Sequence, residues 1–167
     1  PVWDDWLQTR IPAARDRLGA RWDSCYLSAP IWRFALGAGL AGPAPAFGVM
    51  MPSVDRVGRQ FPLTLAGPLP AALAEEALAD PIFDRLEDIA LEALDDDLMT
   101  RETLSARLAG VALPQAATDS NGEAGTGSLW RAETADGPLE MRCPRLPDAA
   151  AFTGLFDIGI RKEANPL

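Results

Sequence analysis

The chain has 167 residues, of which 48% are hydrophobic and 23% are charged, a composition typical of one globular domain rather than a disordered chain. Its formal net charge is −9, which argues against a nucleic-acid-binding surface, since phosphate contacts require concentrated positive charge. The most apolar stretch, residues 34–51, carries no charge but is interrupted by glycines and prolines. It therefore predicts no membrane-spanning helix and no direct membrane insertion.

Histidine is absent from the whole sequence. Its absence excludes Ser-His-Asp and Cys-His catalytic arrangements, as well as metal sites built on histidine. The two cysteines, Cys25 and Cys143, lie far apart and belong to no CxxC pair. They indicate a reducing compartment and buried thiols rather than a disulfide framework or reactive groups.

A helical pattern opens the chain. Apolar residues recur at intervals of three and four from Trp3 to Trp22, the spacing of a helix with one buried face. Pro12 interrupts this pattern, because it lacks an N–H donor and crowds the carbonyl of Gln8. We therefore expect a kink or two abutting helices, with Gly19 as a terminator.

The following residues predict an antiparallel sheet. Residues 24–36 are rich in bulky and aromatic side chains, and Pro30 near their middle indicates a bulge or an edge position. After a glycine- and proline-rich segment, a second strand is expected at residues 48–51 and a third within residues 60–69. The simplest arrangement is a meander through residues 26–69.

Helices are predicted again from Pro70 onward. The clearest one follows Asp80, a favourable N-cap residue, and has Pro81 at its first position, where the missing donor costs nothing. The acidic residues 95–97 fall at its end and help to stop it, because the helix macrodipole disfavours anions there. A shorter helix is expected to follow from Thr100.

The last part of the chain predicts a flexible loop at residues 114–127. Two strands then form a hairpin, with Asp136 and Gly137 in the turn. A short helix closes the fold at residues 147–156, and the tail is expected to fray. No repeat or second core is evident, so a single domain is predicted over the whole chain.

The least generic segment, residues 51–65, reads MPSVDRVGRQFPLTL and lies between two predicted strands. Its polar and glycine positions are Ser53, Asp55, Arg56, Gly58 and Arg59. One interpretation makes Ser53 a nucleophile or Asp55 a base, although no histidine is present to activate the serine. In the other, Asp55 holds local N–H groups or pairs with Arg59, and Gly58 supplies an unusual backbone dihedral. We favour the structural turn, with or without a partner contact.

Two further patterns resemble known sites only weakly. The three acidic residues 95–97 point in different directions on a helix and have no EF-hand spacing, so a solvated helix end is favoured over a cation site. Gly37, Gly39 and Gly42 have the spacing of a GxGxxG motif. Prolines follow where the nucleotide-binding fold requires a helix, so no nucleotide site is predicted.

Three segments carry a specific resemblance to a known family: PIWRFAL at residues 30–36, MPSVDRVGR at 51–59 and FPLTL at 61–65. The segments WDDWLQ, LWRAE and LPDAAAF add weaker support. Together they resemble the TagF family, also called ImpM, whose members are accessory proteins of bacterial type VI secretion. The resemblance extends over nearly the whole chain.

This resemblance implies a compact α/β domain with a mainly antiparallel sheet flanked by helices, similar to longin or profilin modules. It further implies a cytoplasmic, non-enzymatic repressor that acts after translation by contact with a forkhead-associated scaffold protein of the secretion apparatus. Some relatives are fused to a PppA-type phosphatase, which is a further expected partner in the pathway. The resemblance implies no cofactor or metal, and it transfers no catalytic residue.

The chain departs from the family pattern at two places. Relatives usually carry a glycine-rich GxxGKLPxxGDF segment before the first helix, and this sequence lacks it. We therefore expect either a segment missing from the sequence or a sheet that lacks one strand. Gln60 stands where many relatives carry an aromatic residue, so the exposed face of the strand is expected to be less apolar.

Three hypotheses follow for the function of residues 51–65. The first is a protein-binding repressor whose interface has Ser53, Asp55, Arg56 and Arg59, with Trp32 and Arg33 nearby, because paired arginines recognise acidic or phosphorylated groups. The second is a small hydrolase that uses Asp55 with Ser53 and requires a pocket and a raised carboxyl pKa. The third is a structural module in which the motif only fixes the fold.

Overall fold

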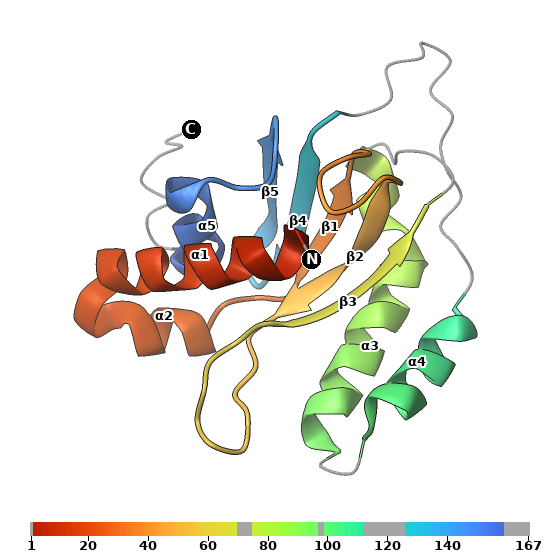
Figure 1. Ribbon diagram of the computed structural model, residues 1–167, viewed down its shortest axis with the longest axis horizontal. Helices are drawn as coiled ribbons and strands as arrows, with labels where there is room; N and C mark the ends of the chain where they lie inside the picture. The colour runs from red at the N-terminus through yellow and green to blue at the C-terminus, as the bar shows by residue number, and fades with distance from the viewer. Residues whose placement is uncertain (1, 70–74, 97–98, 112–125, 159–167) are drawn as a thin grey trace.

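The computed structural model describes residues 2–69, 75–96, 99–111 and 126–158 (Figure 1). Five strands form one antiparallel sheet in the order β3-β2-β1-β4-β5. They are β1 (Trp32–Leu36), β2 (Ala46–Met51), β3 (Leu63–Pro68), β4 (Ser128–Thr134) and β5 (Gly137–Cys143). The first three strands form the predicted meander, and the β4–β5 hairpin pairs with the free edge of β1.

Helices cover both faces of this sheet (Figure 1). One face carries α1 (Val2–Leu18), the 3₁₀ turn η1 (Gly19–Arg21), α2 (Trp22–Leu27) and α5 (Ala149–Phe156). The other face carries the 3₁₀ turn η2 (Glu75–Ala79) and α3 (Pro81–Asp95), against which α4 (Arg101–Ala109) packs. The expected α/β domain, a mainly antiparallel sheet flanked by helices, is confirmed.

The buried side chains form two clusters, one on each face of the sheet. Because side chains alternate along a strand, β1 sends Trp32, Phe34 and Leu36 into the cluster under α1, α2 and α5. The same strand sends Ala35 into the cluster under α3. The expectation of a single core is therefore wrong in detail: one domain contains two cores, separated by a sheet that is covered on both sides.

Helix ends follow the predicted capping chemistry. The Asp80 carboxylate accepts a hydrogen bond from the Ile82 amide, and Pro81 occupies the first turn of α3. Thr100 caps α4 in the same way through the Thr103 amide. The hairpin turn is also confirmed, since Gly137 has a φ of 111°, in the left-handed region that glycine adopts without strain.

Three local predictions are wrong. Residues 24–36 do not form one strand, because the chain is helical to Leu27 and the strand begins only at Trp32. Pro12 does not divide the first helix, which runs unbroken through it and ends before Gly19, whose φ is 53°. The part of the 70–79 helix that is described, residues 75–79, is a 3₁₀ turn.

Some predictions fall outside the described residues: the start of the helix at Pro70, the end of the acidic run at Asp97, most of the loop at 114–127 and the tail. Within the described ranges, none of the helices combines the length and the apolar character needed to cross a bilayer.

Candidate interaction loop

The residues that connect β2 to β3, Pro52 to Pro62, are called the interaction loop below. In Figure 1 this yellow loop extends away from the sheet, beside the end of α2. It contains the polar motif that the sequence singles out. The rigid sheet therefore presents this motif to solvent at one end of the molecule.

Asp55 organises the tip of the loop. Its Oδ1 accepts hydrogen bonds from the backbone N–H groups of Val57, at 3.0 Å, and Arg59, at 2.8 Å. Its Oδ2 accepts a third from Arg59 Nε at 2.7 Å. Gly58 supplies a φ of 83°, and its N–H donates to the Asp55 carbonyl. The predicted structural turn is thus observed in each of its parts.

These contacts also set the ionisation of Asp55. The hydrogen bond from the Arg59 amide, followed by the Arg59 guanidinium, lowers the pKa of Asp55 below its ordinary 3.8. A carboxylate held in its charged form by three donors is a poor proton acceptor. The hydrolase hypothesis requires the opposite shift, so this geometry counts against Asp55 as a general base.

The first leg of the loop is fixed by Tyr26, on α2. The buried phenol oxygen donates to the Ser53 carbonyl at 2.9 Å and accepts from the Ser53 amide at 3.1 Å. Burial raises the pKa of Tyr26, against smaller opposing effects of Ser53 and Arg15, so the phenol remains a donor at neutral pH. Ser53 is therefore held through its backbone.

The second leg is fixed by Gln60. Its Oε1 accepts from Trp22 Nε1 and from Arg15 Nη2, and its Nε2 donates to Asp23 at 2.8 Å. A β-bridge between Val54 and Gln60 joins the two legs. Gln60, interpreted from the sequence only as a less apolar strand position, is thus the anchor of the loop to α1 and α2. No local pattern indicates partners that are 37 to 45 residues away.

The side chains that the loop exposes are partly apolar. Arg59 keeps 81% of its side chain accessible, and Val57 is 76% exposed. Val54 and Phe61 are also among the exposed large hydrophobic residues, and Arg56 is exposed. The sequence analysis emphasised the polar positions and overlooked these apolar ones. In this short turn the apolar residues alternate with arginines, and this pattern is the signal that could have revealed them.

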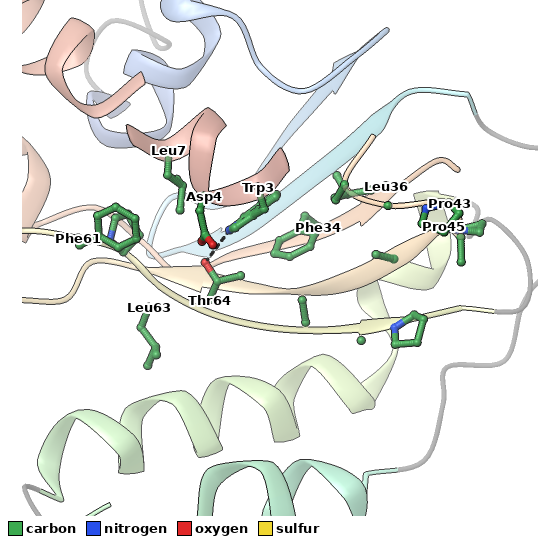
Figure 2. A pocket seen from close by; sticks show the side chains of 18 residues that line it. Trp3, Asp4, Leu7, Phe34, Leu36, Pro43, Pro45, Phe61, Leu63 and Thr64 are labelled. Carbon is green, nitrogen blue, oxygen red and sulfur yellow. Dashed lines mark hydrogen bonds between the residues drawn. The ribbon is translucent and has the colours of Figure 1, made fainter. Parts of the chain in front are cut away.

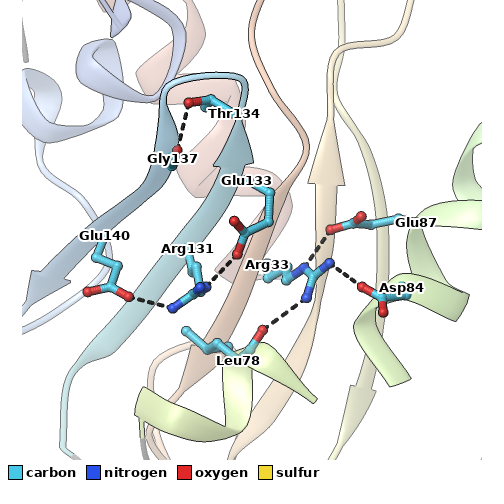
Figure 3. Close-up of polar contacts among 9 residues, drawn as sticks. All are labelled: Arg33, Leu78, Asp84, Glu87, Arg131, Glu133, Thr134, Gly137 and Glu140. Atoms are coloured by element: carbon cyan, nitrogen blue, oxygen red, sulfur yellow. Dashed lines mark hydrogen bonds and ion pairs between the residues drawn. The ribbon is translucent and has the colours of Figure 1, made fainter. Parts of the chain in front are cut away.

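Trp32 and Arg33 lie inside the fold, on opposite faces of β1. Trp32 is 1% exposed, and its Nε1 donates to the Leu155 carbonyl at 2.8 Å. Arg33 is buried against α3, where it donates to Glu87 at 2.6 Å, Asp84 at 2.5 Å and the Leu78 carbonyl at 3.2 Å (Figure 3). The structure brings together Ser53, Asp55, Arg56 and Arg59 but not these two residues.

Electrostatics explain how Arg33 can be buried while charged. Burial alone would lower its pKa, but the hydrogen bonds to Glu87 and Asp84 raise the pKa above its ordinary value. Its neighbour across the sheet, Arg131, is balanced separately by Glu133 and Glu140 (Figure 3). Arg33 therefore joins the sheet to α3. Its guanidinium is buried, so it is not accessible for the partner contact that the sequence predicted.

A cavity of about 680 Å³ lies beside the interaction loop (Figure 2). It is bounded by the start of α1, by β3 on the side of the sheet that carries α1, and by residues 41–45. Its walls are mainly apolar and include Trp3, Leu7 and Phe34. Trp3 Nε1 donates to Thr64 Oγ1 at 3.3 Å across it. No pattern in the amino-acid sequence indicates this cavity. Neither Ser53 nor Asp55 lines it, so it provides no pocket for the proposed hydrolase.

Other candidate chemistry is sparse in the described part of the chain. Cys25 and Cys143 are not joined in a disulfide, and they are half-buried rather than fully buried. Over those same residues, no three acidic or cysteine side chains converge where they could hold a metal ion.

The structure therefore defines a class: an α/β domain with one antiparallel sheet between two helical layers, and a rigid loop that projects from the sheet. Residues 1–111 match the family model described as the TagF N-terminal domain, type VI secretion system-associated. Because the match covers more than half of the sequence, the chain belongs to the TagF family.

A solved structure agrees with this assignment. The crystal structure of PA0076 from Pseudomonas aeruginosa PAO1 has a TM-score of 0.75 and 31% sequence identity to this chain. The similarity covers 92% of this chain and 82% of that one, so it includes the sheet and both helical layers. No curated protein matches the sequence.

Proposed function

We propose that this chain is a cytoplasmic, non-enzymatic regulator that represses type VI secretion after translation by binding another protein. Family membership supports the association with type VI secretion. The sequence resemblance to TagF proteins supports the direction of the effect and the partner, a forkhead-associated scaffold protein. A PppA-type phosphatase is proposed to act in the same pathway.

The observation that carries this proposal is the ordered, exposed interaction loop. Asp55 fixes its tip, and Tyr26 and Gln60 fix its two legs. Surface loops that carry binding residues usually lose conformational entropy when they bind, which weakens their affinity. Here the internal hydrogen bonds have already ordered the backbone, which favours recognition by a preformed surface.

A secretion assay tests the regulatory part of the proposal. Deleting the gene is expected to raise the amount of protein secreted by the type VI apparatus into the culture supernatant, and expressing the chain from a plasmid is expected to lower it again. An unchanged amount of secreted protein in both strains would contradict a repressor role.

A binding measurement tests the partner. The purified forkhead-associated scaffold is titrated into the full chain by calorimetry, and saturable binding is expected. The variants Asp55→Ala and Arg56→Ala are expected to bind more weakly while they remain folded. If every loss of binding is accompanied by unfolding, the motif serves only the fold, as the structural-module hypothesis states.

A further inference from the structure

We propose that the contact surface of the interaction loop is the group Val54, Val57, Arg59 and Phe61, and that it inserts into an apolar socket edged by carboxylates on a folded partner. The inference rests on the proposed function and names the surface chemistry that the partner must have. It differs from the sequence-based hypothesis, in which Ser53, Asp55, Arg56 and Arg59 make the contact, because it keeps only Arg59 of these and adds the apolar side chains.

Some polar groups of the interaction loop already have hydrogen-bond partners within the protein. The Asp55 carboxylate accepts three hydrogen bonds within the loop, and the Ser53 backbone is bonded to Tyr26 and to the Phe61 amide. A partner that took these groups would have to break bonds that hold the loop in shape. Their role is to position the neighbouring side chains.

The apolar side chains carry the driving force. Val57 sits at the tip of the turn and is 76% exposed, with Val54 and Phe61 on the two legs at 47% and 42%. Three of the seven exposed large hydrophobic side chains in the described part of the chain thus lie within eight residues. Removing such a cluster from water is the main source of affinity at protein interfaces. Val57 projects from the turn, while Phe61 lies at the base of the loop, where it also lines the cavity beside α1. A group of this shape fits a concave apolar socket.

Charge identifies the edge of that socket. Arg59 is highly exposed and uses Nε to bind Asp55, and its guanidinium carries further N–H donors on its two terminal nitrogens. The chain as a whole carries a net charge of −9, so acidic surfaces are repelled over most of the molecule. The arginine-bearing loop is where carboxylates on a partner gain a favourable contact.

Carboxylates suit this loop better than a phosphate group does. The Asp55 carboxylate stays ionised beside Arg59, and its negative charge opposes a dianion more strongly than it opposes a single carboxylate. Exposed valine and phenylalanine side chains lie on both sides of Arg59 along the loop. The surface therefore matches an apolar socket with acidic edges.

Calorimetric titration of the forkhead-associated scaffold with matched variants tests this inference. Val57→Asp is expected to weaken binding at least 30-fold, because it places a carboxylate where an apolar group should enter. Arg59→Ala is expected to weaken binding about 5- to 10-fold, with a smaller loss at high salt. Leu91→Asp, at an exposed leucine of α3 in the other helical layer, is the matched control and should bind like wild type.

The outcomes separate this inference from the proposed function. If the wild-type chain does not bind the scaffold, the proposed partner is wrong and the inference fails with it. If the wild type binds and Val57→Asp binds equally well, only the loop surface is wrong. Thermal melting of each variant ensures that the loss is not unfolding. Loss of wild-type binding after phosphatase treatment of the scaffold would overturn the carboxylate edge.

Discussion

Two arginine–carboxylate sites in this protein show how differently the same chemistry can be used. Arg33 is buried under α3 and binds Asp84 and Glu87. Arg59 is exposed in the interaction loop and binds Asp55. The first site joins residues that are 51 and 54 positions apart, whereas the second joins residues only four positions apart. One fixes the packing of a helix on the sheet, and the other fixes the shape of a surface.

The comparison predicts that the two sites fail in different ways. Losing a charge partner in the interior costs several times more than losing one in solvent, because the remaining buried polar groups cannot all turn to water. Losing a partner in the loop leaves the fold intact and changes only what the loop presents. Stability should therefore report on Arg33, and binding or local order should report on the loop.

The largest expected effect is at Arg33. Arg33→Met keeps a long side chain but removes the bonds to Glu87, Asp84 and the Leu78 carbonyl. Breaking a buried ion pair costs about 3–5 kcal/mol, and because Asp84 stays accessible to water, we expect a loss of about 3 kcal/mol in the free energy of unfolding. Urea denaturation measures it.

Arg131→Met is the matched control for that experiment. Arg131 lies directly opposite Arg33 in the sheet and also binds two carboxylates, but its own side chain is 21% accessible, against 5% for Arg33. Its loss should cost about 1 kcal/mol or less. Equal losses in the two variants would show that burial does not distinguish these sites.

A smaller effect is expected at Gly58, which holds its φ of 83° with open space around the position of a Cβ atom. Gly58→Ala adds no clash, so its cost is conformational strain alone, about 1 kcal/mol. Gly42→Ala also meets open space and has no positive φ, so it should be neutral or slightly stabilising. If the two alanine variants unfold at the same urea concentration, alanine at position 58 adopts the positive φ without measurable strain, which contradicts this prediction.

The smallest effect is a local pH dependence at Asp55. Because its pKa is lowered in the folded loop, its hydrogen bonds stabilise the loop fully above the unfolded value and are lost as the pH falls through the folded pKa. An NMR titration should show the Asp55 carboxyl protonating below 3.8, with the Val57 and Arg59 amide signals moving at the same midpoint. The urea-unfolded chain, in which Asp55 should protonate near the ordinary value, is the control.

Much of the fold follows from local sequence signals. The N-cap at Asp80, the start of a helix at Thr100 and the hairpin turn at Gly137 are short-range features, and the sequence predicts each of them. The turn held by Asp55 is also local, since its bonds span at most four residues. The meander was recognised because apolar runs alternate with turn residues.

The remaining features depend on contacts between distant parts of the chain. Bulky residues at 24–27 resemble the start of a strand by composition, yet tertiary packing of Trp22 and Tyr26 against α5 favours a helix. From the sequence alone, Arg33 would be interpreted as a surface charge, because the two carboxylates that bind it lie on α3, far away in the sequence. The anchoring of Gln60 and the cavity beside α1 likewise exist only once the helical layer is in place.

The anchoring of the loop has a consequence for how this protein can change over evolution. The two legs are tied to α2 and α1, through Tyr26 and Gln60, rather than only to the strands that they connect. A replacement of Trp22 would therefore alter the presentation of Arg59 without touching any exposed atom. Substitutions at positions 22, 26 and 60 are therefore expected to change partner binding through the shape of the loop rather than through a direct contact.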